Sequence, residues 1–109
     1  MAIQPMGYVQ KTLSDVQILT RAEFEGTALT LDATAFVEGV CKAGAPIGAD
    51  GTIQNDGDCI GINLFDVYAD RPQATIIRKG YVNDALITTH YGTAIDSTAK
   101  AVLPMIIFE

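Results

Sequence analysis

Apolar side chains in this chain alternate with polar or small ones over several short segments, and this period of two most constrains the fold. In residues 59–67, Ile60, Ile62 and Leu64 fall on one face of an extended strand, with a glycine and an asparagine on the other. Such alternation is typical of a half-buried β-strand, because successive side chains point to opposite faces of a sheet. The sequence therefore predicts a mainly β fold.

The same criteria predict further strands along the chain. The candidates are residues 28–32, 36–42, 74–82 and 105–108, with shorter ones at residues 16–20 and 52–54. The run Thr75-Ile76-Ile77 favours an extended backbone because these side chains branch at Cβ. Gly80, inside the same candidate strand, permits a bend or a bulge.

Glycine, proline, asparagine and aspartate separate these strands. Residues 43–48 contain two glycines and a proline, which force an irregular path. Asp50-Gly51, residues 55–58 and residues 70–72 are turn signals, since glycine adopts positive φ and Asp or Asn side chains bond to nearby amides. We therefore expect short strands joined by tight connections.

Two short helices are predicted near the C-terminus. Asn83 can cap a helical turn over residues 84–87, and Asp96 can cap a helix over residues 97–103, because both side chains accept hydrogen bonds from unpaired first-turn amides. Pro104 ends the second helix. The predicted fold class is thus β-rich with short helices.

The first 20 residues differ from the rest of the chain. Their apolar residues are irregularly spaced, and Pro5 and Gly7 interrupt any regular element. We expect residues 1–20 to form an N-terminal arm that is flexible or becomes ordered on binding, and residues 21–109 to form one β-rich domain.

The net charge of the chain limits the kinds of molecule that it can bind. The formal net charge is −6, and the seven basic residues are scattered, so a nucleic-acid partner is disfavoured. No stretch is long enough to span a bilayer, and the start lacks the pattern of a signal peptide. We expect a protein made in the cytoplasm, with no membrane partner and with apolar surface left for a protein partner.

The sequence contains few candidates for a catalytic residue or a reactive cysteine. His90 is the single histidine, and no motif supplies a matched nucleophile, so a position in a loop or at a helix end is favoured. Cys41 and Cys59 form no CxxC motif; burial as small apolar side chains is favoured over a disulfide or a zinc site. We expect a protein that is not an enzyme.

Two loops resemble ligand sites superficially. Residues 55–58 are acidic and contain a glycine, as calcium-binding loops do. They lack the regular ligand spacing and the terminal glutamate of such loops, so a turn is favoured. Residues 44–51 are glycine-rich but lack the Gly-Lys-Ser/Thr signature of a phosphate loop. No cofactor and no metal are expected.

A series of motifs nevertheless points to a known family. The motifs are Ala45-Pro46-Ile47-Gly48, Asp56-Gly57-Asp58-Cys59-Ile60-Gly61-Ile62, Ala74-Thr75-Ile76-Ile77, Lys79-Gly80-Tyr81 and Asn83-Asp84-Ala85-Leu86-Ile87, followed by a helix and an apolar strand in residues 97–108. In this order and spacing they resemble the lambda-type phage head-decoration proteins. The resemblance covers residues 27–109, and the N-terminal third departs from the family pattern.

The resemblance implies a compact, small β-barrel or sandwich-like decoration fold with an N-terminal arm. It also implies a homotrimer that binds the major capsid protein at three-fold positions on the exterior of the expanded head and stabilises the virion against internal DNA pressure. In the family the arm adds to strands of the capsid protein. The residues expected to contact the capsid here are Ile3, Pro5, Met6, Tyr8 and Val9.

Two other readings stay open. One is a different virion β-domain, such as a tail or fibre component. The other is a small binding module resembling biotinyl or lipoyl carrier domains, which carry a modifiable lysine at a hairpin tip. Lys42 and Lys79 lie near glycines, but neither has the flanking motif of those carriers.

Overall fold

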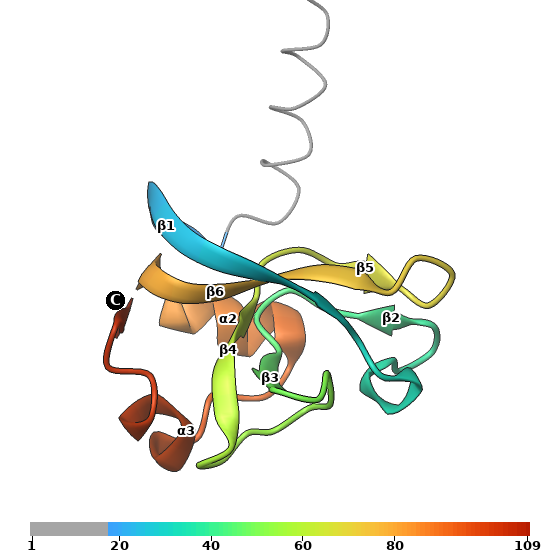
Figure 1. The fold of residues 1–109 in the computed structure, drawn as a ribbon. Coiled ribbons are helices and arrows are strands. Elements are labelled where there is room, and N and C mark those ends of the chain that lie inside the picture. Colours follow the sequence, from blue (N-terminus) through green and yellow to red (C-terminus); the bar gives the residue numbers. More distant parts are fainter. Residues whose placement is uncertain (1–17) are drawn as a thin grey trace, which may run out of the picture.

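The computed structural model describes residues 18–109, and these residues form the mainly β fold that the sequence predicts (Figure 1). The elements, in chain order, are β1 (Leu19–Thr30), a 3-10 helix η1 (Ala33–Ala35), β2 (Val40–Cys41), β3 (Pro46–Gly48), β4 (Cys59–Asn63), β5 (Val67–Tyr68), β6 (Gln73–Val82), α2 (Asp84–Tyr91), α3 (Ser97–Ala101) and β7 (Ile106–Phe108).

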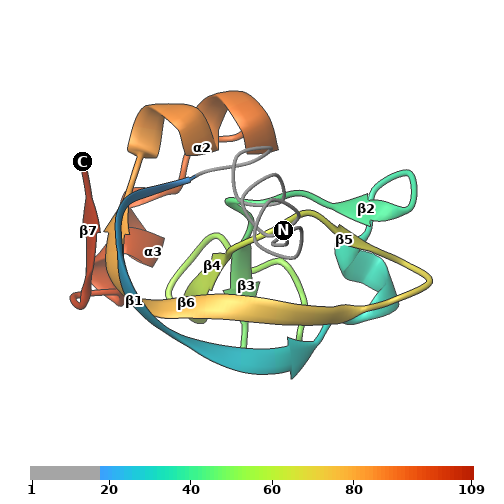
Figure 2. The same cartoon turned by 90° about the horizontal axis from the view of Figure 1, so that it is seen from above.

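Strand β6 organises the larger of two sheets. The sheet has the order β1-β6-β4-β3, and β7 also pairs with β6, in parallel. All other pairs in this sheet are antiparallel, and β2 with β5 forms a separate two-stranded sheet. Figure 2 shows β1 following β6 side by side, with α2 lying on the other side of β6. β6 thus connects nearly every part of the fold.

The pairing of β1 with β6 is regular only in its second half. From Gly26↔Ile77 to Thr30↔Gln73 the register is continuous, but it shifts on both sides of the adjacent pairs Phe24↔Gly80 and Glu25↔Lys79. Gly80 has a φ of 154°, a conformation that side chains disfavour. The irregular pairing here agrees with the bend or bulge predicted at Gly80.

Two apolar cores lie on opposite sides of β6. Ile76 and Ile77 are both fully buried, yet each belongs to a different core, because neighbouring residues of a strand point to opposite faces. The first core includes Ile18, Ile62, Ile77, Val82, Ile87, Ala99, Leu103 and Ile106; the second includes Leu31, Ala35, Cys41, Ala45, Ile47, Val67, Ala74 and Ile76. Helix α3 contributes to the first core, and α2 contributes Ile87 to the first core while its last residue, Tyr91, packs against the second.

Both predicted helix caps are confirmed. The Asn83 side chain accepts a hydrogen bond from the Leu86 amide, and the Asp96 side chain accepts one from Thr98. Helix α2 continues four residues beyond the predicted turn, to Tyr91, and ends at Gly92, whose left-handed φ of 97° closes it.

The predicted strand over residues 36–42 is wrong for most of its length. Only Val40–Cys41 forms a strand, because Glu38 and Gly39 have positive φ values of 54° and 83° and turn the chain between Val37 and Val40. The predicted strand at residues 52–54 is likewise reduced to a single bridge between Ile53 and Ile47.

Further boundaries differ from the sequence prediction. The strands expected at residues 16–20 and 28–32 overlap a single strand, β1, and α3 ends at Ala101, before the expected end at residue 103. The irregular path expected for residues 43–48 contains the three-residue strand β3. The single strand expected over residues 59–67 is divided into β4, which pairs with β3 and β6, and β5, which pairs with β2 in the other sheet. Residue Ile18, which the prediction placed in the arm, is fully buried in the first core, and β1 begins at Leu19.

Candidate functional site

The predicted capsid-binding residues lie at the N-terminus. Ile3, Pro5, Met6, Tyr8 and Val9 all fall outside the residues that the structure describes. The candidate sites of residues 18–109 are therefore considered in turn: the histidine, the cysteines, the acidic turns and the exposed apolar surface.

His90 lies in the last turn of α2, in agreement with the prediction of a helix-end position. Its Nε2 is 2.8 Å from Oδ1 of Asp66, and the same oxygen accepts the Ala43 amide at 2.9 Å. The two side chains are each about one quarter exposed. The pair therefore joins the end of α2 to the loops that contain Asp66 and Ala43. These hydrogen bonds give both side chains a structural role.

The two cysteines are free and buried, and they belong to different cores. Burial raises the pKa of Cys41 to about 11 and also raises the pKa of Cys59. A nucleophilic or metal-binding cysteine requires the opposite shift, because the thiolate is the reactive form. The thiols of this fold are thus kept protonated and act as small apolar side chains, as the sequence predicts.

A buried amide next to Cys41 was missed by sequence reasoning. Asn63 is fully buried, and its Nδ2 donates to the carbonyl oxygens of Cys41 at 3.1 Å and Lys42 at 3.2 Å. Its Oδ1 has no partner within the described chain. The side chain holds the loop after β2 against β4, so its role is to position the backbone.

Three acidic turns share one local pattern. Asp32, Asp50 and Asp96 each precede a threonine by two residues and accept hydrogen bonds from both its amide and its hydroxyl. These bonds to the threonines lower the pKa of each carboxyl below its usual value of 3.8. The carboxylates are therefore occupied in closing turns and capping helices.

The calcium-like segment at residues 55–58 is a turn, as the sequence predicts. Asp56 accepts the Asp58 amide, and the Asn55 side chain bonds to Ala94 and Asp96 across the surface. Within residues 18–109 no group of three or more His, Cys, Asp or Glu side chains is placed to hold a metal ion. The glycine-rich loop borders a shallow hollow that also contains Asp50 and Asp58, whose charges would repel a phosphate.

The two lysines considered as modification sites lie in different surroundings. Lys79 is inside β6, where its ammonium is 3.9 Å from Glu25 of β1, and it is therefore not at a hairpin tip. Lys42 begins the turn after β2.

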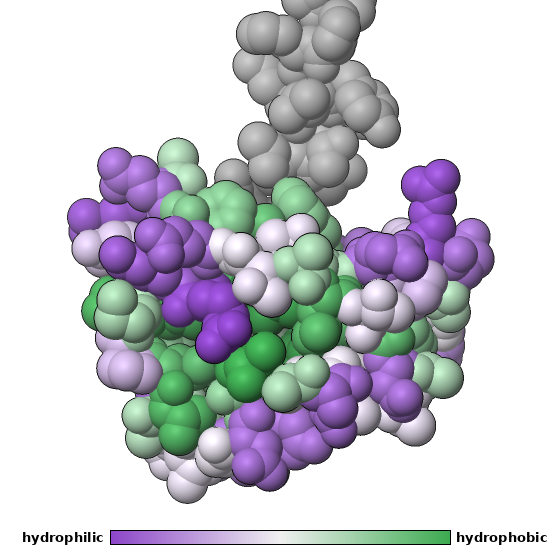
Figure 3. All heavy atoms as spheres, in the orientation of Figure 1, coloured by the Kyte–Doolittle hydropathy of each residue, from purple (hydrophilic) through white to green (hydrophobic). Residues whose placement is uncertain are grey.

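An open groove lies between β1, β6 and β7 on the described surface. This apolar groove is lined by Glu23, Phe24, Glu25, Lys79, Gly80, Tyr81, Pro104, Met105 and Ile107 and has a volume of about 500 Å³. Apolar residues gather over the middle and the β7 side of the face seen in Figure 3, with hydrophilic residues among them. Such a groove offers side-chain area for contact with a partner.

The charges around the apolar groove are mostly paired within the chain. Lys79 pairs with Glu25, and Arg21 is 3.1 Å from Glu109 while its guanidinium lies 4.3 Å from the centre of the Tyr81 ring. Arg21 and Glu109 thereby connect the start of β1 to the C-terminus. The paired charges leave the groove close to neutral, which favours an apolar occupant over a charged one.

Comparisons with protein-family models, with curated proteins and with solved structures found no match to this chain. Neither helix of the described residues has the length and apolar character that crossing a membrane requires.

Proposed function

We propose that this chain is a phage head-decoration protein, which binds the exterior of the expanded capsid as a homotrimer at three-fold positions. The observation that carries the proposal is the ordered series of family-like motifs in residues 45–87. These motifs fall on β3, β4, β6 and α2, followed by α3 and the apolar β7. The described surface is consistent with a binding role, since the groove between β1, β6 and β7 is open and mostly apolar.

The proposed activity is stabilisation by binding. A ligand that binds only the assembled, expanded shell stabilises that state by about 2.7 kcal/mol when its free concentration is 100 times its dissociation constant. A trimer contacts the shell through three equivalent arms, and the linkage raises the effective concentration of the second and third arms. The virion would thereby resist the outward pressure of packaged DNA without any chemical step.

The arm is the proposed capsid contact. Ile3, Met6, Tyr8 and Val9 supply apolar side chains, and Pro5 and Gly7 disfavour a helix that runs unbroken through this segment. Strand addition suits such a segment, because main-chain hydrogen bonds give affinity while alternate side chains occupy pockets. The major capsid protein is the proposed partner.

The arm's role is tested by co-sedimentation with expanded heads of the phage that encodes the chain. Deletion of residues 2–12 is expected to abolish binding, and so is a variant with Ile3, Met6, Tyr8 and Val9 all changed to Asp. A matched control changes Gln4, Gln10 and Thr12 to Ala in the same arm and is expected to bind normally. Undiminished binding by the deletion would exclude the arm from the mechanism.

A further inference from the structure

We propose that Asp56-Gly57 is a site of spontaneous covalent modification, at which the folded chain slowly converts the aspartate to isoaspartate. The sequence contains two Asp-Gly pairs, Asp50-Gly51 and Asp56-Gly57. Glycine hinders attack of its own amide nitrogen on the preceding carboxyl group least, because it has no Cβ. The two pairs have different surroundings in the structure, and only the second is free to react.

The reaction joins the Gly57 amide nitrogen to Cγ of Asp56 and releases water. A C–N bond forms, a C–O bond of the protonated carboxyl group breaks, and the hydroxyl leaves with the amide proton. Water then opens the cyclic imide at either carbonyl carbon. Opening at the side-chain carbonyl restores aspartate, whereas opening at the main-chain carbonyl leaves isoaspartate, in which the main chain continues through Cβ. The sequence of steps needs no oxidant and no cofactor.

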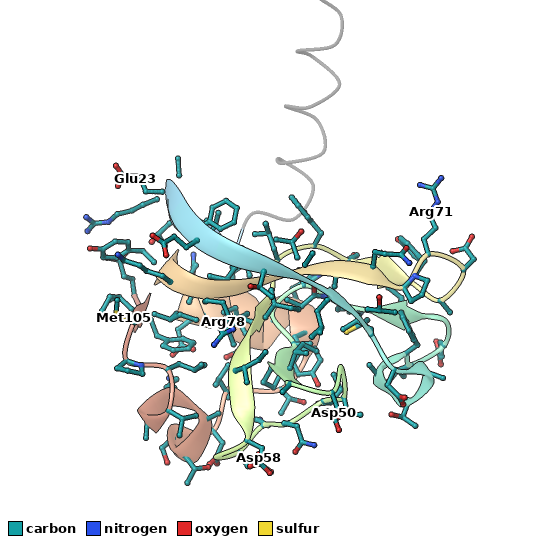
Figure 4. All side chains as sticks on the ribbon, in the orientation of Figure 1. Glu23, Asp50, Asp58, Arg71, Arg78 and Met105 are labelled. Atoms are coloured by element: carbon teal, nitrogen blue, oxygen red, sulfur yellow. The ribbon has the colours of Figure 1, made fainter. Side chains whose placement is uncertain are left out.

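The reacting groups of the second pair are accessible. Asp56, Gly57 and Asp58 are exposed, and Figure 4 shows Asp58 on the outside of the molecule where β4 begins. Among the described residues, the Gly57 amide donates no hydrogen bond. The Asp56 carboxylate accepts the Asp58 amide at 2.9 Å, which turns it toward the main chain that follows. A Cβ at position 57 would meet no atom within 4 Å, so this backbone has room to approach the carboxyl group.

The first pair is held by its surroundings. The Gly51 amide donates to the Gly48 carbonyl oxygen at 3.0 Å, and a Cβ at the buried position 51 would be 2.6 Å from the Thr30 carbonyl oxygen. The Asp50 carboxylate accepts both the hydroxyl and the amide of Thr52. These bonds lower the pKa of Asp50 below 3.8, so less of the protonated form that loses water is present. Ring closure here requires several hydrogen bonds to break.

Isomerisation at position 56 alters a turn that joins two parts of the fold. The Asp56 carbonyl oxygen accepts the Cys59 amide at 3.2 Å, where β4 begins. The preceding Asn55 side chain bonds to the Ala94 carbonyl oxygen and to the Asp96 amide, just before α3. Isoaspartate adds a methylene group to the main chain and moves the carboxylate onto Cα. The modification therefore loosens the connection between β4 and α3.

The test is prolonged incubation of the folded full-length chain at about pH 5 to 6, where an ordinary aspartate is partly protonated. An isoaspartyl carboxyl methyltransferase with labelled S-adenosylmethionine counts the isoaspartate, and fragmentation spectra of the peptides locate it. Position 56 is expected to accumulate at least about ten times as much isoaspartate as position 50, because breaking one hydrogen bond to a charged group slows a reaction by about that factor.

Two variants and an unfolded sample are the controls. Gly57→Ala keeps the fold, since its Cβ meets no atom within 4 Å, and is expected to suppress isoaspartate at position 56 because the methyl group hinders the attacking nitrogen. Asp56→Glu keeps the charge and is expected to abolish the product, since a larger ring must close. In urea, positions 50 and 56 are expected to react at similar rates, because the hydrogen bonds around Asp50 are lost.

Equal amounts of isoaspartate at positions 50 and 56 of the folded chain would overturn the inference, and so would a product at position 56 that forms only in urea. An unchanged yield in Gly57→Ala would also overturn it. The isomerised fraction, separated by ion exchange, is expected to unfold at a lower urea concentration than the unmodified chain, and equal midpoints would overturn the structural consequence. None of these measurements depends on binding to heads.

Discussion

Gly61 on β4 lies so close to the backbone of Ile77 on β6 that a Cβ at position 61 would be 2.4 Å from the Ile77 carbonyl oxygen. The contact is with backbone of the central strand, which cannot move without disturbing the pairing of β6 with β1, β4 and β7. We therefore expect Gly61→Ala to lower the free energy of unfolding by about 3 kcal/mol, as overpacking of a rigid core does.

Urea unfolding of the Gly61→Ala protein checks this expectation. The control is Gly57→Ala, at a glycine where a Cβ would meet no atom within 4 Å, and it should change the stability by less than about 0.5 kcal/mol. Equal stabilities of the two variants would show that β4 and β6 are not packed as described.

The buried amide of Asn63 is expected to contribute strongly to stability. Asn63→Ala removes the donors to the Cys41 and Lys42 carbonyl oxygens and leaves both without this partner in a buried loop. The expected loss is about 3 kcal/mol, since an unpaired buried polar group costs 1–3 kcal/mol.

Asn55→Ala is the matched control, because it removes hydrogen bonds of the same amide type at the surface. Asn55→Ala should lower the free energy of unfolding by about 1 kcal/mol in the same measurement. A larger loss for Asn55→Ala than for Asn63→Ala would contradict the structural role of the buried Asn63 amide.

Acid should weaken the fold through the three acidic turns. Hydrogen bonds from threonines lower the pKa of Asp32, Asp50 and Asp96 below 3.8 in the folded chain. Because the folded pKa is depressed, the stabilisation is present above pH 3.8 and is lost as the pH falls through the folded pKa. A protein with all three changed to Asn keeps the caps but cannot titrate there. In urea unfolding measured at several pH values, its free energy of unfolding should fall less steeply below about pH 4 than that of the wild type. Identical pH profiles of the two proteins would contradict the lowered pKa values of the three carboxyl groups.

The cysteines should react slowly while the chain is folded. With a pKa of about 11 for Cys41, the thiolate fraction at pH 8 is about 100-fold smaller than for an ordinary thiol. A chromogenic disulfide reagent is expected to modify both thiols quickly in urea and slowly in buffer. Since the folded pKa is raised, the free energy of unfolding should also decrease as the pH rises above 9, the ordinary thiol value. Equally fast modification with and without urea would show that the thiols are accessible.

Local signals in the sequence predicted much of the fold. The alternation at residues 59–63 and the β-branched run in β6 mark two real strands, and Asn83 and Asp96 mark the true starts of α2 and α3. These features are set by neighbouring residues, through side-chain period and capping, so they are readable without tertiary information.

Features that depend on distant contacts were not predictable in this way. Alternation suggested one polar face for β4, yet Gly61 and Asn63 are buried because a second core covers that face. The turn at Glu38 and Gly39 interrupts a segment whose composition favours a strand. The exposure of Met105 and Ile107 depends on how β7 pairs with β6, so the sequence predicted an apolar strand there but not the apolar groove.

Binding to heads before and after expansion tests the central proposal most directly. The full-length chain is mixed with unexpanded and with expanded heads of the phage that encodes it, and the bound fraction is measured after sedimentation. The account predicts saturable binding to expanded heads at three copies per three-fold position and none to unexpanded heads. Failure to bind expanded heads would contradict it.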